Sequence, residues 1–191
     1  MAYRICLKEV EGIWFGVALS ENGRIKASNF YKERKDIIRS IVGKLPFGSC
    51  FSEEKAEGAA LDILRSMSLV YEGKPVDGVF EFELKELPSF TRRALLVTLS
   101  IPHGRVATYS GIAKALGDEG AARAVGNAEA SNPFAPLVPC HRVVAFDLSL
   151  GGYGGGLEMK RAILEREGII FLGEHISREC LWKPKEFKSS C

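Results

Sequence analysis

The stretch TYSGIAKALGDEGAARAVGNAEASNP, residues 108–133, decides the fold of the second half of the chain. Its first part has apolar residues at helical spacing, Thr108 in an N-cap position and Gly117 as a stop. A second helix is expected to begin at the acidic pair Asp118–Glu119 and must end before Pro133. Helix, glycine turn and helix form the helix-turn-helix pattern. By pattern alone, an ordinary pair of packed helices is an equally good interpretation.

The second of these helices is rich in small residues, and Arg123 stands as a long side chain among six of them: Ala121, Ala122, Ala124, Val125, Gly126 and Ala128. A helix that fills a core would show Leu or Ile every three to four residues. A slim helix can instead enter the DNA minor groove, about 6 Å wide, with an arginine that reaches into the base stack. The alternative is a helix packed closely on a neighbour, with Arg123 in a salt bridge. The residues expected at the DNA are Ala122, Arg123, Ala124 and Gly126.

The chain has 191 residues, of which 46% are hydrophobic and 26% charged, and a net charge of +2. This composition is typical of a globular protein with one full core or two small ones. The N-terminus lacks the apolar run of a signal peptide, and no membrane-spanning run of about 18 apolar residues exists, so we expect a cytoplasmic protein. The charge permits nucleic-acid binding without arguing for it.

The charges around the helix-turn-helix are few and mixed. Such a surface cannot neutralise many phosphates, so backbone N–H groups at helix N-termini are expected to share in DNA binding. From residue 105 to 142 the basic residues are Arg105, Lys114, Arg123 and Arg142, and the acids are Asp118, Glu119 and Glu129.

The five cysteines are widely spaced and include no CxxC pair, which argues against a disulfide framework and against a zinc site. A reducing cytosol is the simple interpretation. A disulfide between Cys6 and Cys50 is conceivable if the source is a hyperthermophile.

The first half reads as a small α/β unit. Apolar and β-branched runs predict strands, and Asn22-Gly23 is a strong hairpin signal. A break near residues 85–89, marked by Pro88, is expected to separate this unit from the second half. The strands are expected within 3–10, 12–20, 25–30 and 77–84, and the helices within 31–45 and 53–70.

The stretch VPCHRVV, residues 138–144, places a cysteine beside a histidine. A free thiol has a pKa near 8.5, so Cys140 needs a base or a positive neighbour to become a nucleophile. His141 points to the opposite side of an extended chain, so the two meet only around a turn or through a water. A buried cysteine beside a surface histidine is the alternative. The acids that could orient His141 are Glu158, Glu165 and Glu167, on an expected helix that Gly168 ends.

Five motifs in this order resemble the O6-alkylguanine-DNA alkyltransferase (methylated-DNA-protein-cysteine methyltransferase) family. The resemblance covers roughly residues 88–172 and is most specific at Pro-Cys-His-Arg-Val. The first half matches only in general character the ribonuclease-H-like domain of the family. The motifs are IPHGRVATYSGIAKALG, AARAVGNA, SNP, VPCHRVV and GGYGGGLEMKRAILEREG.

The resemblance implies a role for each site residue. Cys140 would accept the alkyl group from O6 of a damaged guanine, His141 would act through a water to keep Cys140 thiolate-like, and Glu167 would orient His141. Asn132 would brace the link between the recognition helix and the active-site loop. Arg123 would fill the gap left by the flipped guanine.

The resemblance also implies how the base is held. Tyr109 would hydrogen-bond the flipped base at N3, the carbonyls of Cys140 and Val143 would accept from its N2 amine, and Tyr153 with the Gly154 N–H would close the pocket near O6. The chain departs from the family pattern twice. Gly154 stands where serine is common, and in NPFAP the second proline, Pro136, comes one position late, which affects how the base stacks.

These implications define the expected protein: an α/β N-terminal domain with a small antiparallel sheet, and a mostly α C-terminal domain with a winged-helix-like helix-turn-helix. It would repair O6-alkylguanine, and possibly O4-alkylthymine, in double-stranded DNA bound through the minor groove. It would act as a monomer, once per molecule, without cofactor, metal or membrane. The alternatives are a lesion binder that transfers nothing and a helix-turn-helix regulator with an inert cysteine. The expected domains are 1–86 and 87–175, with a tail at 176–191.

Overall fold

A computed structural model describes residues 1–187 of the chain. The chain divides into two compact units, and each contains short segments from elsewhere in the sequence. Unit 1 comprises Met1–Tyr71, Pro75–Leu84 and Pro133–Leu137. Unit 2 comprises Glu72–Lys74, Lys85–Asn132 and the chain from Val138 onward.

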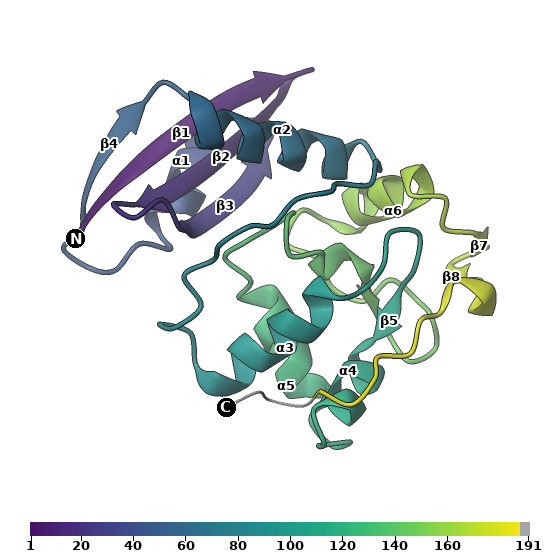
Figure 1. Cartoon of the computed structure of the whole chain (residues 1–191). Coiled ribbons are helices and arrows are strands. Elements are labelled where there is room, and N and C mark those ends of the chain that lie inside the picture. Colours follow the sequence, from purple (N-terminus) through teal and green to yellow (C-terminus); the bar gives the residue numbers. More distant parts are fainter. Residues whose placement is uncertain (188–191) are drawn as a thin grey trace. The chain divides into compact units, whose positions relative to one another are not determined.

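Unit 1 is built on a four-stranded sheet in the order β3-β2-β1-β4 (Figure 1). The first three strands form the predicted antiparallel meander, and Gly23, with a φ of +80°, lies in the predicted hairpin turn. The fourth strand was not predicted, and because it pairs with β1 in parallel the sheet is mixed rather than purely antiparallel. The strands are β1 (Ala2–Val10), β2 (Ile13–Ser20), β3 (Ile25–Tyr31) and β4 (Cys50–Glu54).

Two helices, α1 (Arg34–Val42) and α2 (Gly58–Tyr71), cover opposite faces of this sheet (Figure 1). Successive residues of a strand point to opposite faces. On β2 the Phe15 ring meets the ring of Tyr71 on α2, with centroids 5.9 Å apart. The next residue, Gly16, faces α1 so closely that a Cβ there would lie 2.8 Å from Cγ1 of Ile37. Along β2, therefore, each face of the sheet is covered by one helix.

The predicted strand at 77–84 does not form. Phe82 makes a single β-bridge with Ile25, held by hydrogen bonds from the Ile25 N–H to the Glu81 carbonyl and from the Glu83 N–H to the Ile25 carbonyl. The alternating aromatic residues that suggested a strand do serve packing, because Phe82 lies 4.8 Å from Phe134, centroid to centroid. The alternating pattern therefore predicted correctly that Phe82 is partly buried, but it predicted wrongly that residues 77–84 form a strand.

Unit 2 is mostly helical and contains the predicted helix-turn-helix, formed by α4 (Tyr109–Ala115) and α5 (Ala122–Ala130). Thr108 caps α4 as predicted, because its Oγ1 accepts a hydrogen bond from the Gly111 N–H at 3.0 Å. The other elements are α3 (Ser89–Leu99), β5 (Ala107–Thr108), the 3-10 turn η1 (Cys140–Arg142), β6 (Val143–Val144), α6 (Leu157–Arg166), β7 (Phe171–Leu172), β8 (His175–Ile176) and η2 (Arg178–Cys180).

The second helix of the motif begins later than predicted. The Ala121 N–H donates to the carbonyl of Asp118, so the acidic pair lies in a turn before the helix and caps nothing. The helix ends at Ala130, before Pro133, as predicted. Because this turn precedes it, α5 has only nine residues, and most of them are small.

The C-terminal segment packs on unit 2 as far as Phe187. The Trp182 N–H donates to the Val106 carbonyl at 2.7 Å, and the Phe187 N–H donates to the Ala115 carbonyl at 2.8 Å. Both side chains lie against the core cluster that contains Ile112 and Val125. Through residue 187, no helix is both long and apolar enough to span a bilayer.

No disulfide forms between Cys6 and Cys50. Cys50 pairs with Ala2 and Cys6 with Glu54, so the two cysteines lie four residues apart along the paired strands. Four cysteines of the described chain are free thiols. Cys191 falls outside the described residues.

Candidate active site

The Cys-His pair lies in a turn, not in an extended strand. Pro139 leads into the 3-10 turn η1, in which the Arg142 N–H donates to the Pro139 carbonyl and the Cys140 N–H to the Val138 carbonyl. Cys140 is half-buried, while His141 is fully buried. The turn therefore buries the imidazole of His141 more deeply than Cys140.

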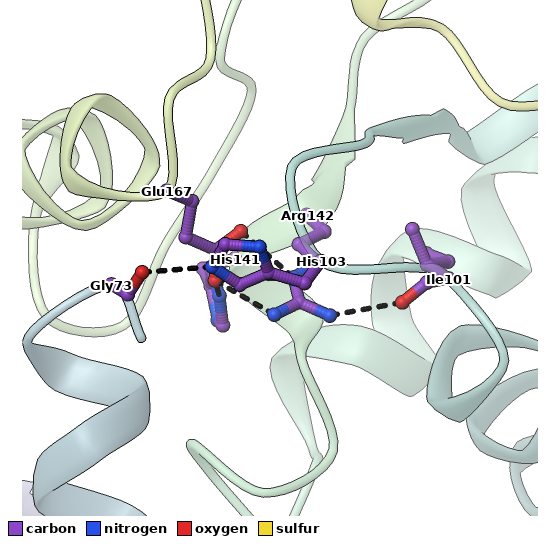
Figure 2. Close-up of polar contacts among 6 residues, drawn as sticks. All are labelled: Gly73, Ile101, His103, His141, Arg142 and Glu167. Atoms are coloured by element: carbon purple, nitrogen blue, oxygen red, sulfur yellow. Dashed lines mark hydrogen bonds and ion pairs between the residues drawn. The ribbon is translucent and has the colours of Figure 1, made fainter. Parts of the chain in front are cut away.

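The carboxylate of Glu167 binds two side chains of this turn, His141 and Arg142. Its Oε1 lies 2.9 Å from His141 Nε2, and its two oxygens accept from the Arg142 guanidinium at 2.8 and 2.9 Å. The remaining Arg142 nitrogen, Nη1, donates to the Ile101 carbonyl at 2.9 Å. Figure 2 shows the cluster, with Gly73 and His103 beside it; His103 Nε2 bonds the Gly73 carbonyl at 2.8 Å.

Glu167 follows α6 as its C-cap residue, and Gly168, with a φ of +82°, turns the chain away. Of the other two candidate acids, Glu165 forms an ion pair with Arg161 within α6, and Glu158 is exposed. Only Glu167, of the three, lies at His141. Arg142, which sequence reasoning counted among the surface bases, is a buried partner of the same carboxylate.

The contacts fix the charge and the tautomer of this cluster. Burial alone would raise the pKa of Glu167, but hydrogen bonds and charge from His141 and Arg142 outweigh it and lower the pKa to about 2. Burial lowers the pKa of His141, against a smaller opposing effect of Glu167. A carboxylate only accepts hydrogen bonds, so the neutral imidazole carries its proton on Nε2. Nδ1 is then a free acceptor, and it is buried without a partner among the described residues.

The surroundings of Cys140 disfavour its thiolate form. Burial raises the pKa of Cys140 to about 11, and the nearby Glu129 carboxylate adds to this effect. A hydrogen bond with Asn132 and the charge of Lys160 act in the opposite direction without overcoming it. Burial therefore acts against a thiolate at Cys140, and the activation of this thiol by His141 stays a prediction.

Asn132 lies where α5 gives way to the active-site loop. Its Nδ2 donates to the Val138 carbonyl at 2.9 Å, and its N–H donates to the Glu129 carbonyl at 3.2 Å. Asn132 thus joins the end of α5, through its backbone N–H, to the residues that precede Cys140, through its side chain. Pro136 is buried and belongs to the segment Pro133–Leu137 of unit 1.

Lys160 is a site residue that sequence reasoning missed. It is fully buried, and its ammonium donates to the carbonyls of Val143 and Leu150, both at 2.6 Å, and of Gly152 at 3.4 Å. Burial lowers its pKa to about 8. A signal did exist, because Lys160 comes three residues before Ile163 and so lies on the apolar face of its helix.

The two tyrosines meet at the loop that follows Leu150: Tyr153 belongs to this loop, and Tyr109 lies against its Gly151. Tyr109 begins α4, and its hydroxyl would lie 3.1 Å from a Cβ placed on Gly151. Burial, then Glu129 and Cys140, raise the pKa of Tyr109. Tyr153 is half-buried, with its ring centroid 6.0 Å from the Lys160 ammonium. Gly154 is exposed, with open space where a side chain would stand.

The helix α5 has two distinct faces. Arg123 and Ala124 are exposed and Ala122 and Gly126 half-buried, whereas Val125, Ala128 and Glu129 are buried on the other side. Arg123 forms no hydrogen bond or ion pair with any residue from 1 to 187, so the salt bridge of the alternative interpretation does not occur in this part of the chain. Its guanidinium is available to a partner outside the chain.

Comparisons with known proteins point in one direction. The family model for the DNA-binding domain of 6-O-methylguanine DNA methyltransferase matches residues 89–169. A methylated-DNA–protein-cysteine methyltransferase of Mycobacterium tuberculosis is 40% identical over 110 residues, which are 58% of this chain and 66% of that protein. A protein of the same name from Saccharolobus islandicus is 36% identical over 126 residues, 65% of this chain and 81% of the relative.

Solved structures extend the likeness into both units. The O6-methylguanine-DNA methyltransferase of Pyrococcus kodakaraensis aligns with a TM-score of 0.67 and 30% identity, over 86% of this chain and 99% of that one. The Mycobacterium tuberculosis protein solved in complex with DNA aligns with a TM-score of 0.68 and 26% identity, over 86% and 92%. The matches cover the mixed sheet as well as the helical unit, and this chain belongs to the methylated-DNA–protein-cysteine methyltransferase family.

Proposed function

We propose that this protein repairs O6-alkylguanine in DNA by transferring the alkyl group to its own Cys140. The observation that carries the proposal is the cluster behind the thiol: a neutral imidazole with a free Nδ1, fixed by a carboxylate that Arg142 keeps ionised. Family membership supplies the substrate class, since the relatives are methylated-DNA–protein-cysteine methyltransferases.

The transfer is a single displacement. His141 Nδ1 takes the thiol proton from Cys140 through one bridging water, and Glu167 stabilises the imidazolium that forms. The sulfur then attacks the alkyl carbon in line with the C–O6 bond, the S–C bond forms, and the electron pair of the broken bond leaves with guanine. Tyr109 donates a proton to N3 of the departing base.

The product determines the kinetics. A thioether on Cys140 has no leaving group that water can displace, in contrast to the thioester of a cysteine hydrolase. The protein is therefore consumed, one molecule for each lesion. The half-buried position of the thiol and its high pKa in the free protein protect it from wasteful reaction before a lesion arrives.

DNA is bound through the outer face of α5. The exposed Arg123 and the small residues beside it fit the minor groove, where Arg123 takes the place of the extruded guanine and offsets part of the unstacking cost of a few kcal/mol. Tyr153, the Gly154 N–H and the carbonyls of Cys140 and Val143 hold the flipped base. We further propose that the protein acts as a monomer in the cytoplasm.

The decisive experiment is an intact-mass measurement after mixing with duplex DNA that contains O6-methylguanine. One methyl group should be added per protein molecule, on the peptide that holds Cys140, and titration should stop at one equivalent. Cys140→Ser should add no mass yet still bind the duplex, and Cys50→Ser, a change at the other accessible thiol, should transfer normally. Binding without added mass in the unaltered protein would favour the non-transferring lesion binder.

A further inference from the structure

The inner face of α5 carries a buried acid close to the proposed acceptor. Glu129 is 7% exposed and lies on the side of the helix away from the exposed Arg123. Its Oε1 accepts a hydrogen bond from Thr98 Oγ1 of α3 at 2.7 Å. Its Oε2 is buried and has no hydrogen-bond partner within residues 1–187. An ionised carboxylate with one neutral donor is costly at such a depth.

Charged groups on the elements around α5 are nearly all committed elsewhere. On α3, Arg93 donates to the Leu116 carbonyl and Arg92 is half-buried. On α4, Lys114 pairs with Glu119 at the surface. In η1, Arg142 is bound by Glu167, which also holds His141.

Three titratable groups remain that interact electrostatically with Glu129: Tyr109, Cys140 and Lys160. Lys160 is the cation of this set. Its hydrogen bonds go to backbone carbonyls, so its charge reaches Glu129 and Cys140 through space.

Glu129 and Cys140 compete for this one cation. An ionised Glu129 opposes a second negative charge on Cys140, and each anion alone gains from Lys160. Burial, against the Thr98 bond and Lys160, raises the pKa of Glu129 to about 7. Near neutral pH a proton on Glu129 therefore leaves Lys160 to the sulfur.

We propose that Glu129 is a positioning residue that governs how readily Cys140 loses its proton: the neutral acid leaves Lys160 as counter-charge for the thiolate, and the carboxylate takes it away. The idea adds a control element to the proposed function but does not depend on it, because thiol reactivity can be measured without alkylated DNA.

The test is the rate at which iodoacetamide alkylates Cys140 between pH 6 and pH 9, followed by mass spectrometry of the Cys140 peptide so that Cys50 does not contribute. Glu129→Gln keeps the shape of the neutral acid and cannot ionise. The variant should match the unaltered protein at pH 6 and react about 2- to 3-fold faster at pH 7.5, where Glu129 is mostly ionised and Lys160, with a pKa of about 8, still mostly carries its charge.

Two further variants separate this role from a structural one. Glu119→Gln makes the same change of charge at an exposed acid and should leave the profile unchanged. Thr98→Val removes the donor that stabilises ionised Glu129, so the pH above which ionised Glu129 slows the alkylation of Cys140 should be higher in this variant than in the unaltered protein.

Equal pH profiles for Glu129→Gln and the unaltered protein, with the fold of both verified by circular dichroism, would overturn the proposal. So would a gain at pH 6 as large as the gain at pH 7.5, because that points to a looser pocket. If alkyl transfer fails while the labelling profile behaves as expected, the proposed function is wrong and the role of Glu129 stands.

Discussion

The pKa values of two buried carboxyl groups in unit 2 shift in opposite directions. At the end of α6, Glu167 meets the guanidinium of Arg142 and the Nε2–H of His141, and its pKa falls to about 2. On the inner face of α5, Glu129 meets one hydroxyl, from Thr98, and its pKa rises to about 7. Burial disfavours the charge at both places, so the supply of donors decides the outcome.

This difference assigns different work to the two acids. A carboxylate that stays ionised at every relevant pH can fix a tautomer and balance an imidazolium, which is what Glu167 does for His141. A carboxyl group that titrates near neutral pH can report or control protonation, which we propose for Glu129. Arg142 is the residue that separates the two cases, because it is the only full positive charge bound directly to either acid within residues 1–187.

The largest effect is expected from Glu167→Gln. The change leaves the buried Arg142 without a counter-charge, so the free energy of unfolding should fall by about 3–5 kcal/mol in urea denaturation at pH 7. Transfer to Cys140 should also slow, because His141 loses the charge that stabilises its protonated form. Glu165→Gln, which breaks the exposed pair with Arg161 on the same helix, should cost less than about 1 kcal/mol. Equal losses in the two variants would show that Glu167 and Arg142 are not a buried pair in solution.

The stability of the protein should depend on pH in opposite ways at the two acids. The depressed pKa of Glu167 stabilises the fold above pH 4.5, and this contribution is lost as the pH falls toward 2. The raised pKa of Glu129 has the reverse sign: the folded state holds its proton longer than the unfolded chain, so stability falls as the pH rises from about 4.5 to 7.

Glu129→Gln should remove only the loss of stability between pH 4.5 and 7 and leave the acid dependence due to Glu167 unchanged. At pH 8 the variant should be more stable than the unaltered protein by roughly 2–3 kcal/mol, and at pH 4.5 the two should be nearly equal. Urea denaturation at a series of pH values measures the difference. A variant that is less stable at pH 8 would mean that the carboxylate has a donor that the structure does not reveal.

The sequence predicted those parts of the site that lie close together along the chain. The helix-turn-helix and the Thr108 cap follow from local spacing. The adjacent Cys140 and His141 indicated a possible nucleophile and base, with one of three downstream acids as the partner of His141. Glu167 was singled out among three acids by the family resemblance, because helical spacing alone cannot say which of them faces a turn 26 residues away. Local sequence patterns identified the three candidate acids, and the tertiary structure shows that Glu167 is the one that contacts His141.

The parts that were missed depend on partners distant in sequence. Arg142 and Glu129 were counted as surface charges, yet Arg142 reaches the end of α6 and Glu129 reaches α3. The strand β4 was missed because all five of its residues are exposed, so it carries no alternation of apolar residues. It exists because its backbone pairs with β1. Conversely, the alternation at 77–84 reflected packing of Phe82 without a ladder.

The smallest effect on stability, and a sharp one on function, is expected from Arg123→Ala on the outer face of α5. Arg123 touches neither acid and is exposed, so unfolding free energy should change by less than about 0.5 kcal/mol. Repair of O6-methylguanine in duplex DNA should slow about 10-fold or more, because the gap left by the flipped base stays unfilled. Reaction with the free base O6-benzylguanine should be unchanged, since a free base needs no flipping. Lys114→Ala removes a different exposed charge of the same motif and should weaken duplex binding only slightly. Parallel losses on duplex and free base would mean that the outer face of α5 acts on the chemistry of Cys140, as the inner face does, and the division of labour between the two faces would be lost.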